Sequence, residues 1–203
     1  MLPAPAPSRR ELNKTATREA IATAALDFLR TRDIKEFTVD DVANAAGVSR
    51  RTFFNYFSSV EAAVASFTER YLDSLIDALR DRPADEPILA SAGFALSAVD
   101  SPHDLAVLAE TYTLTQDAQL ARFQLQTWDE CGVKITEVIR ERLPASTSDM
   151  YIHALVGAVI GSCRAAFQVW FSERGSDTGP ESLARLRELL TEAITLLSQG
   201  FAN

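Results

Sequence analysis

The chain has 203 residues, of which 47% are hydrophobic and 24% are charged, so it is long and apolar enough to bury a sizeable core. The formal net charge of -8 excludes a protein that is basic throughout, and two cysteines are too few for a disulfide-stapled secreted scaffold. The charge is uneven: residues 1–60 hold nine Lys/Arg and seven Asp/Glu, whereas residues 61–203 hold eleven and twenty-one. Only the N-terminal part is therefore suited to approach a polyanion.

The N-terminus begins "MLPAPAPSRR", which has no apolar core and is not a secretory signal. Its alternating Pro and Ala predict a disordered tail over residues 1–11. A stretch near the C-terminus, residues 150–171, is apolar enough to suggest a membrane span, but it contains His153, Arg164 and Gln168, which are costly in lipid. We expect a buried helix there instead, and a cytoplasmic protein with no membrane partner.

Apolar residues recur at helical spacing along the chain and no segment alternates as a strand does, so the sequence predicts an all-α fold. In the N-terminal part the expected helices cover residues 12–32, 38–46, 49–56 and 59–80. A linker, "DRPADEP", occupies residues 81–87. After it the expected helices cover residues 88–99, 102–115, 117–143, 148–174 and 180–201.

Capping residues mark where the N-terminal helices begin. Thr38 and Asp41 form a capping box with Asp in place of the usual Glu, Gly47 breaks the chain, and Ser49 caps the next short helix. Ser58 and Glu61 form an S-x-x-E box at the start of a long helix. We therefore predict a three-helix head over residues 12–58 and a larger helical body over residues 59–203.

Two short helices joined through Gly47 behind a longer first helix describe a helix-turn-helix, in which the second helix of the pair contacts DNA bases. Arg50 and Arg51 lie at the start of that second helix, where a guanidinium can reach the O6 and N7 atoms of guanine. Phe53 and Phe57 are expected in the core of the head. The alternative is that the two arginines belong only to a solvated helix start.

The stretch "FTVDDVANAAGVSRRTFFNYFSSVEAAV", residues 37–64, resembles the DNA-binding signature of the tetracycline-repressor-like (TetR/AcrR-type) transcriptional regulators. Its Thr-Val, Ala-x-x-Ala-Gly-Val-Ser, Thr-x-x-x-Tyr-Phe and capping Ser elements occur in order and at the family's spacing. Two positions depart from the pattern, since the family often has Tyr at Phe54 and Lys at Val60. The candidate DNA-contacting residues are Lys14, Arg18, Thr38, Ser49, Arg50, Arg51, Thr52, Asn55 and Tyr56.

The resemblance implies a homodimer that binds a palindromic operator and pairs through the last two long helices. Gly157 and Gly161 are four residues apart, and small residues let two helices approach closely, either between subunits or within one. The apolar stripe of the last helix is core or interface. The candidate dimer residues are Gly157, Gly161, Leu186, Leu190 and Ile194.

The resemblance also implies a pocket in the body for a small-molecule effector, and aromatic linings suit apolar or planar ligands. Each of the rings could equally be plain core. The candidate ligand-binding residues are Phe94, His103, Tyr112, Phe123, Trp128, Phe167 and Trp170. The predicted function is a DNA-binding regulator, usually a repressor in this family, that an apolar or aromatic molecule releases from the operator.

Three other functions fit the sequence less well. An enzyme is not expected, because no nucleophile elbow, phosphate loop or HExxH motif occurs. A metal or redox sensor could use Cys131, Cys163, His103 and His153, but these lack zinc-ligand spacing, so we predict no metal and no cofactor. A helical adaptor that does not bind DNA would not need the paired arginines.

Overall fold

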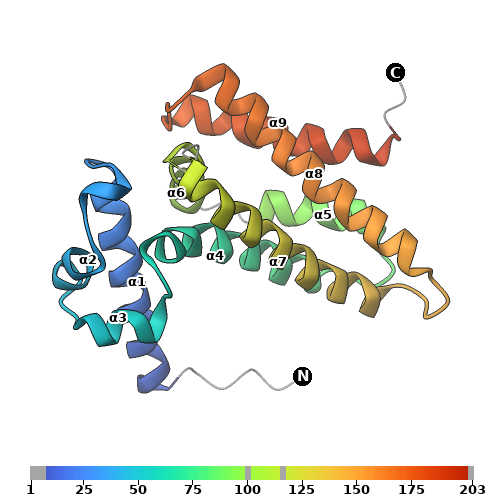
Figure 1. Cartoon of the computed structure of the whole chain (residues 1–203). Helices are drawn as coiled ribbons and strands as arrows, with labels where there is room; N and C mark the ends of the chain where they lie inside the picture. The colour runs from blue at the N-terminus through green and yellow to red at the C-terminus, as the bar shows by residue number, and fades with distance from the viewer. Residues whose placement is uncertain (1–7, 99–101, 115–117, 201–203) are drawn as a thin grey trace. The chain divides into compact units, whose positions relative to one another are not determined.

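A computed structural model describes residues 8–98, 102–114 and 118–200, without the side chains of residues 102, 103, 118 and 119. All regular elements in these ranges are helices (Figure 1), which confirms the predicted all-α class. The chain divides into two compact units, Met1–Phe67 and Thr68–Asn203, and the division falls inside helix α4 (Val60–Arg80). The functional boundary between residues 58 and 59 stays a prediction.

The N-terminal unit, here called the head, contains three complete α-helices and a short 3-10 turn. They are α1 (Arg9–Leu29), η1 (Ile34–Glu36), α2 (Val39–Ala45) and α3 (Arg50–Tyr56). Helix α1 begins before the predicted residue 12, because Ser8 and Glu11 form a reciprocal capping box: each backbone N–H donates to the other residue's side chain. The prediction of a disordered tail is therefore wrong for residues 9–11. Residues 1–7 lie outside the described ranges.

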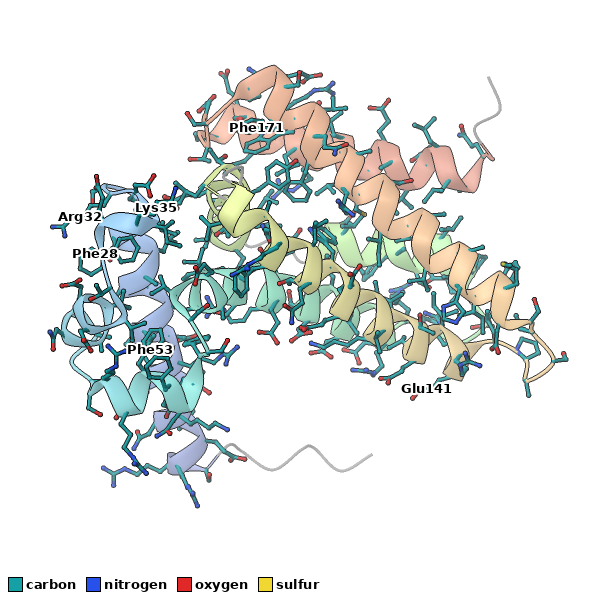
Figure 2. The ribbon with its side chains drawn as sticks, in the orientation of Figure 1. Phe28, Arg32, Lys35, Phe53, Glu141 and Phe171 are labelled. Atoms are coloured by element: carbon teal, nitrogen blue, oxygen red, sulfur yellow. The ribbon has the colours of Figure 1, made fainter. Side chains whose placement is uncertain are left out.

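Buried side chains from the helices of the head form its core. Ile21 and Val42 have no exposed surface, and Phe53, labelled in Figure 2, also has none. Phe57 is 5% exposed, so the prediction that Phe53 and Phe57 are core residues is confirmed. A core filled by α1, α2 and α3 holds the two helices of the helix-turn-helix in a fixed orientation.

Local capping interactions set the turns of the helix-turn-helix. Thr38 and Asp41 form the predicted box, and hydrogen bonds from the Thr38 hydroxyl and N–H lower the pKa of Asp41. Gly47 has φ +67°, in the left-handed region that glycine adopts without strain, and ends the turn as predicted. Ser49 accepts a 3.0 Å hydrogen bond from the Thr52 N–H and so caps α3.

The start of helix α4 differs from the prediction by one residue. The Ser59 Oγ accepts a hydrogen bond from the Ala62 N–H at 3.2 Å, so Ser59 caps the helix and Ser58 does not. An N-cap side chain binds the N–H two or three residues ahead, and the first helical residue here is Val60. The S-x-x-E pattern therefore located the helix but not its cap.

The C-terminal unit, here called the body, contains the remainder of α4 and five further helices within the described ranges. They are α5 (Ile88–Ala98), α6 (Pro102–Leu114), α7 (Ala118–Arg142), α8 (Asp149–Arg174) and α9 (Pro180–Ser198). Helices α8 and α9, orange and red in Figure 1, lie side by side. Ser148 caps α8 by accepting from the Tyr151 N–H, as the sequence predicts for a helix that begins there.

An aromatic cluster fills the part of the body core between α6 and α8. The ring of Tyr112 lies 5.1 Å from that of Phe167 and 6.5 Å from that of Trp170. Trp170 has no exposed surface, and its indole N–H donates to both oxygens of Ser182 at 3.0 Å. Phe171, labelled in Figure 2, also packs against Tyr112, with 6.0 Å between the ring centres. The rings pack against one another, and the hydrogen bonds to Ser182 pair the polar group of Trp170.

Helix α8 has one buried face and one exposed face. Only 22% of its most apolar stretch is buried, so the prediction of a buried helix over residues 150–171 is wrong for the outer face. By length and composition α8 could cross a membrane, but core helices of soluble proteins meet the same criterion, so this is weak support for a span. In the middle of the helix, between residues 154 and 165, every exposed residue is small, namely Ala154, Gly157, Ala158, Gly161 and Ala165.

Candidate DNA-binding and ligand-binding sites

The exposed start of helix α3 is the candidate DNA-reading surface. Arg50 and Arg51 are its first two residues and both are exposed. The Arg50 guanidinium forms an exposed ion pair with Asp40 at 2.8 Å and lies 5.4 Å from the centre of the Phe54 ring. Arg51 forms no side-chain ion pair or hydrogen bond within the part of the chain that the structure describes. Arg51 can therefore extend toward DNA without breaking an intramolecular contact.

The hydroxyl groups predicted to contact phosphate already serve the helix caps. Thr38 bonds Asp41, and the Ser49 and Thr52 hydroxyls are 2.8 Å apart. Each hydroxyl oxygen keeps further hydrogen-bonding capacity, so a cap and a phosphate contact are compatible. Among the other candidates, Lys14 and Asn55 are exposed and Tyr56 is half-buried.

Arg18 has a structural role inside the head. Its guanidinium donates to the Tyr56 carbonyl at 3.4 Å and lies 4.5 Å above the Phe57 ring. These contacts fasten α1 to the end of α3. Arg18 thus has a role in the head that requires no DNA, and its contact with DNA stays a prediction. Lys14, one helical turn earlier on the same helix, is exposed.

The body contains an apolar cavity of about 70 Å³ that is partly open to solvent. Its wall comes from α4, α5, α7, α8 and α9 and is formed almost wholly by aliphatic side chains. The lining residues are Leu72, Leu75, Ile76, Leu79, Ile88, Ala92, Ala95, Leu96, Trp128, Cys131, Ile135, Ile139, Val159, Ile160, Cys163 and Ile194. Such a wall offers dispersion contacts and no strong hydrogen bond, so it suits hydrocarbon.

Of the predicted ligand-binding residues, only Trp128 lines this cavity. Tyr112, Phe167 and Trp170 pack in the aromatic cluster, and their contact with a ligand stays a prediction. Phe94 is 49% exposed and lies under the Arg82 guanidinium, and Phe123 lies beside Arg122. The side chain of His103 lies outside the described residues.

The aliphatic residues of the cavity were missed by the sequence analysis, although one signal for them exists. Leu72, Leu75, Ile76 and Leu79 recur at steps of three and four on α4, the pattern of a buried helical face. The pattern cannot distinguish a face that packs fully from one that borders a cavity. Because the prediction of ligand-binding residues favoured aromatic side chains, it named members of the core cluster and missed the aliphatic cavity wall.

Comparison with known proteins identifies the family. The model described as "Bacterial regulatory proteins, tetR family" matches residues 21–65, and the model "MftR C-terminal domain" matches residues 113–202. The chain belongs to the TetR family. MftR of Mycobacterium tuberculosis is 22% identical over 172 residues, which cover 83% of this chain and 87% of that protein. EthR of Mycolicibacterium smegmatis is 30% identical over 131 residues, which cover 61% of this chain and 60% of that protein.

A solved structure shares the fold of this TetR-family chain. It is that of Thermus thermophilus FadR, described as a TetR family transcriptional repressor in complex with lauroyl-CoA. The two chains are 20% identical, the TM-score is 0.56, and the match covers 92% of this chain and 95% of that one. The named relatives are transcriptional regulators and not enzymes, so this TetR-family protein is a transcriptional regulator.

The predicted dimer residues fall into two groups in the structure. Leu186, Leu190 and Ile194 are at most 5% exposed within a single chain, so they are core residues and the interface prediction is corrected for them. Gly157 and Gly161 are exposed, and a Cβ atom added to either would meet no atom within 4 Å. These two glycines therefore do not serve close packing within one subunit.

The two cysteines both line the apolar cavity and are free thiols. Burial raises the pKa of Cys131 to about 12 and that of Cys163 to about 12, so both stay protonated at neutral pH. A protonated thiol is a poor metal ligand and a poor nucleophile. Among the described residues no three His, Cys, Asp or Glu side chains gather as a metal site, and His153 is exposed. These observations do not favour a metal or redox sensor.

Proposed function

We propose that the protein is a homodimeric repressor of the cytoplasm that binds a palindromic operator and is released by an apolar small molecule. The observation that carries the proposal is the joint presence of two features in one chain. Arg50 and Arg51 lie exposed at the start of α3, and the body contains a cavity with an almost wholly aliphatic wall. The first suits base readout and the second suits an apolar effector.

A dimer is supported by the outer face of α8. A glycine in an exposed helix interior costs about 1 kcal/mol relative to alanine, and nothing within one chain requires Gly157 or Gly161. Close approach of a partner helix would require them, because a Cβ atom would hold the two backbones apart. A two-fold dimer would also explain a palindromic operator, since each α3 would meet one half-site.

Release is proposed to act through α4. This helix begins in the head, and its later residues Leu72, Ile76 and Leu79 line the cavity. A ligand that moves α4 would change the separation of the two heads in the dimer, and DNA accepts only one half-site spacing. The ligand must bind the released state more tightly than the DNA-bound state, because equal affinity for both would shift nothing. Coupling of about 1–3 kcal/mol is typical, and operator DNA must weaken ligand binding by the same factor.

The test is a selection of duplexes from a random library with the full-length protein, followed by fluorescence anisotropy on the enriched sequence. A palindrome with half-sites about one helical turn apart or slightly more is expected, with affinity that falls steeply as salt rises. The double substitution Arg50→Ala with Arg51→Ala should abolish the enrichment. The matched control is Arg122→Ala together with Arg140→Ala, two exposed positions on helix α7 of the body, which should leave it intact. Failure to enrich any sequence over random duplex would overturn the proposal.

A further inference from the structure

A second space in the body shares lining residues with the apolar cavity. This space is a groove of about 740 Å³ formed by the α4–α5 loop, α5, the end of α7, the start of α8, and α9. Ile88 and Ile194 line both the cavity and the groove, so they form the partition between the two. A ligand could therefore extend from the cavity into the groove by passing these two isoleucines.

The two spaces differ in chemistry. The wall of the cavity is aliphatic apart from Trp128 and the two thiols. The groove is also lined mostly by apolar side chains, but hydroxyl and charged groups border it as well. The hydroxyl groups of Thr191, Thr195 and Ser198 follow one another along α9. Each donates to a backbone carbonyl of its own helix, which leaves its oxygen available as an acceptor. A polar group in the groove thus meets acceptors that can take a hydrogen bond from it.

The charges around the groove favour an uncharged group over an anion. Asp85 and Glu86 both border it, and the pKa of Glu86 is lowered to about 2 by hydrogen bonds from Arg82 and Ser91, so Glu86 is ionised. The one guanidinium that lines the groove, in the part of the chain described, is that of Arg142. Its two terminal nitrogens already donate to three backbone carbonyls and to the Ser91 hydroxyl. A carboxylate ligand would meet two carboxylates and a guanidinium whose terminal donors are committed.

We propose that the effector is a molecule with a single alkyl chain and an uncharged hydroxyl-type end group. The tail of the chain occupies the apolar cavity, the rest of the chain passes Ile88 and Ile194 into the groove, and the end group lies in the groove. The proposal adds a ligand class to the proposed function. It rests on that function only for the effect of the ligand on operator binding, because the ligand itself binds without DNA.

The test compares three ligands of equal chain length by calorimetry with the full-length protein, without DNA, at pH 7.5. They are 1-decanol, decanoate and decyltrimethylammonium. We expect 1-decanol to bind about tenfold more tightly than either charged ligand, which corresponds to about 1.4 kcal/mol. Decanoate or the ammonium binding as tightly as 1-decanol would overturn the assignment of an uncharged end group.

Two variants locate the chain and the end group. Ile88→Trp should close the passage and weaken 1-decanol at least tenfold, whereas Val133→Trp, at a position 62% exposed on α7, should not change binding. Thr195→Lys places a cation on the exposed edge of the groove and should strengthen decanoate several-fold relative to 1-decanol. This variant alters only an exposed residue, so it decides the location of the end group even where Ile88→Trp destabilises the fold.

The result of the DNA selection distinguishes a failure of this ligand proposal from a failure of the proposed function. If selected DNA is bound but 1-decanol does not bind, the ligand class is wrong and the repressor stands. If 1-decanol binds with the expected preference but no DNA is selected, the ligand site stands and the repressor is wrong. An unchanged decanoate affinity in the Thr195→Lys protein would place the end group elsewhere and overturn its assignment to the groove.

Discussion

The head and the body differ in how their functional residues are distributed along the chain. In the head the helix caps, the turn glycine and both candidate reading arginines lie between Thr38 and Ser59, and most of their contacts join residues three or four positions apart. In the body the cavity wall combines residues from Leu72 to Ile194 on five helices. A site built from local contacts is visible in sequence, whereas one built from long-range packing is not.

Substitutions in the two regions should therefore affect different free energies, that of DNA binding in the head and that of folding in the body. Arg50 and Arg51 are exposed, so their removal should affect DNA binding and leave the stability of the head nearly unchanged. The aromatic residues of the body are buried and paired with one another, so their removal should affect stability first. The substitutions below test this contrast.

The largest effect is expected for Trp170→Ala. The indole has no exposed surface, packs 6.5 Å from the Tyr112 ring and donates to Ser182, so its removal leaves a cavity and takes one hydrogen bond from each Ser182 oxygen. The free energy of unfolding should fall by about 3–5 kcal/mol. Urea unfolding followed by circular dichroism measures it. Phe94→Ala, at an aromatic ring that is 49% exposed, is the control and should cost much less. Equal losses in the two variants would contradict the division of the aromatic residues into core and surface.

The next effect concerns base readout in the head. Arg51→Ala should reduce affinity for the selected operator by about 1–3 kcal/mol and relax the preference at one base pair. Arg50→Ala should cost less, because Arg50 must first leave its contacts with Asp40 and Phe54. Anisotropy on the operator and on its single-base variants measures both. Unfolding midpoints should not change, and an effect that is equal on all base variants would mean that Arg51 binds phosphate only.

The sequence predicted the head closely and the body only in outline. The capping box of Thr38, the Gly47 turn and the Ser49 cap were found because each depends on the identity of one residue and its near neighbours. The helices of the body were placed by apolar periodicity. The cavity was not found, because periodicity gives the buried face of each helix but not the distance between helices. For the same reason, Leu186 and Ile194 could not be assigned to core or interface until their burial in one chain was known.

A smaller effect is expected for Gly157→Ala on the outer face of α8. In one chain the added methyl group meets nothing within 4 Å, so the helix itself should gain up to about 1 kcal/mol. If the partner helix packs at this glycine, the same methyl group should weaken dimerisation, and Gly157→Leu should weaken it further. Sedimentation across a concentration series measures the dimer, with Ala145→Leu in the α7–α8 loop as a control. A Gly157→Leu dimer as tight as the wild type would place the interface elsewhere.

The smallest effect concerns a local contact in the body, the carboxylate of Glu86 at the α4–α5 loop. It accepts hydrogen bonds from Arg82 at 2.8 and 2.7 Å and from the Ser91 hydroxyl at 2.6 Å, which lower its pKa from 4.5 to about 2. A carboxyl group whose pKa is lower in the folded state stabilises the fold above its unfolded pKa, and that contribution is lost as pH falls through the folded pKa. The difference in melting temperature between wild type and Glu86→Gln should therefore be full above about pH 5 and disappear as pH falls toward 2. Asp85→Asn, at the exposed neighbouring position, provides the control. A difference that persists unchanged at pH 2 would show that the glutamine disturbs the loop by its shape and not by its lost charge, and the local ion pair would then have no part in holding the body together.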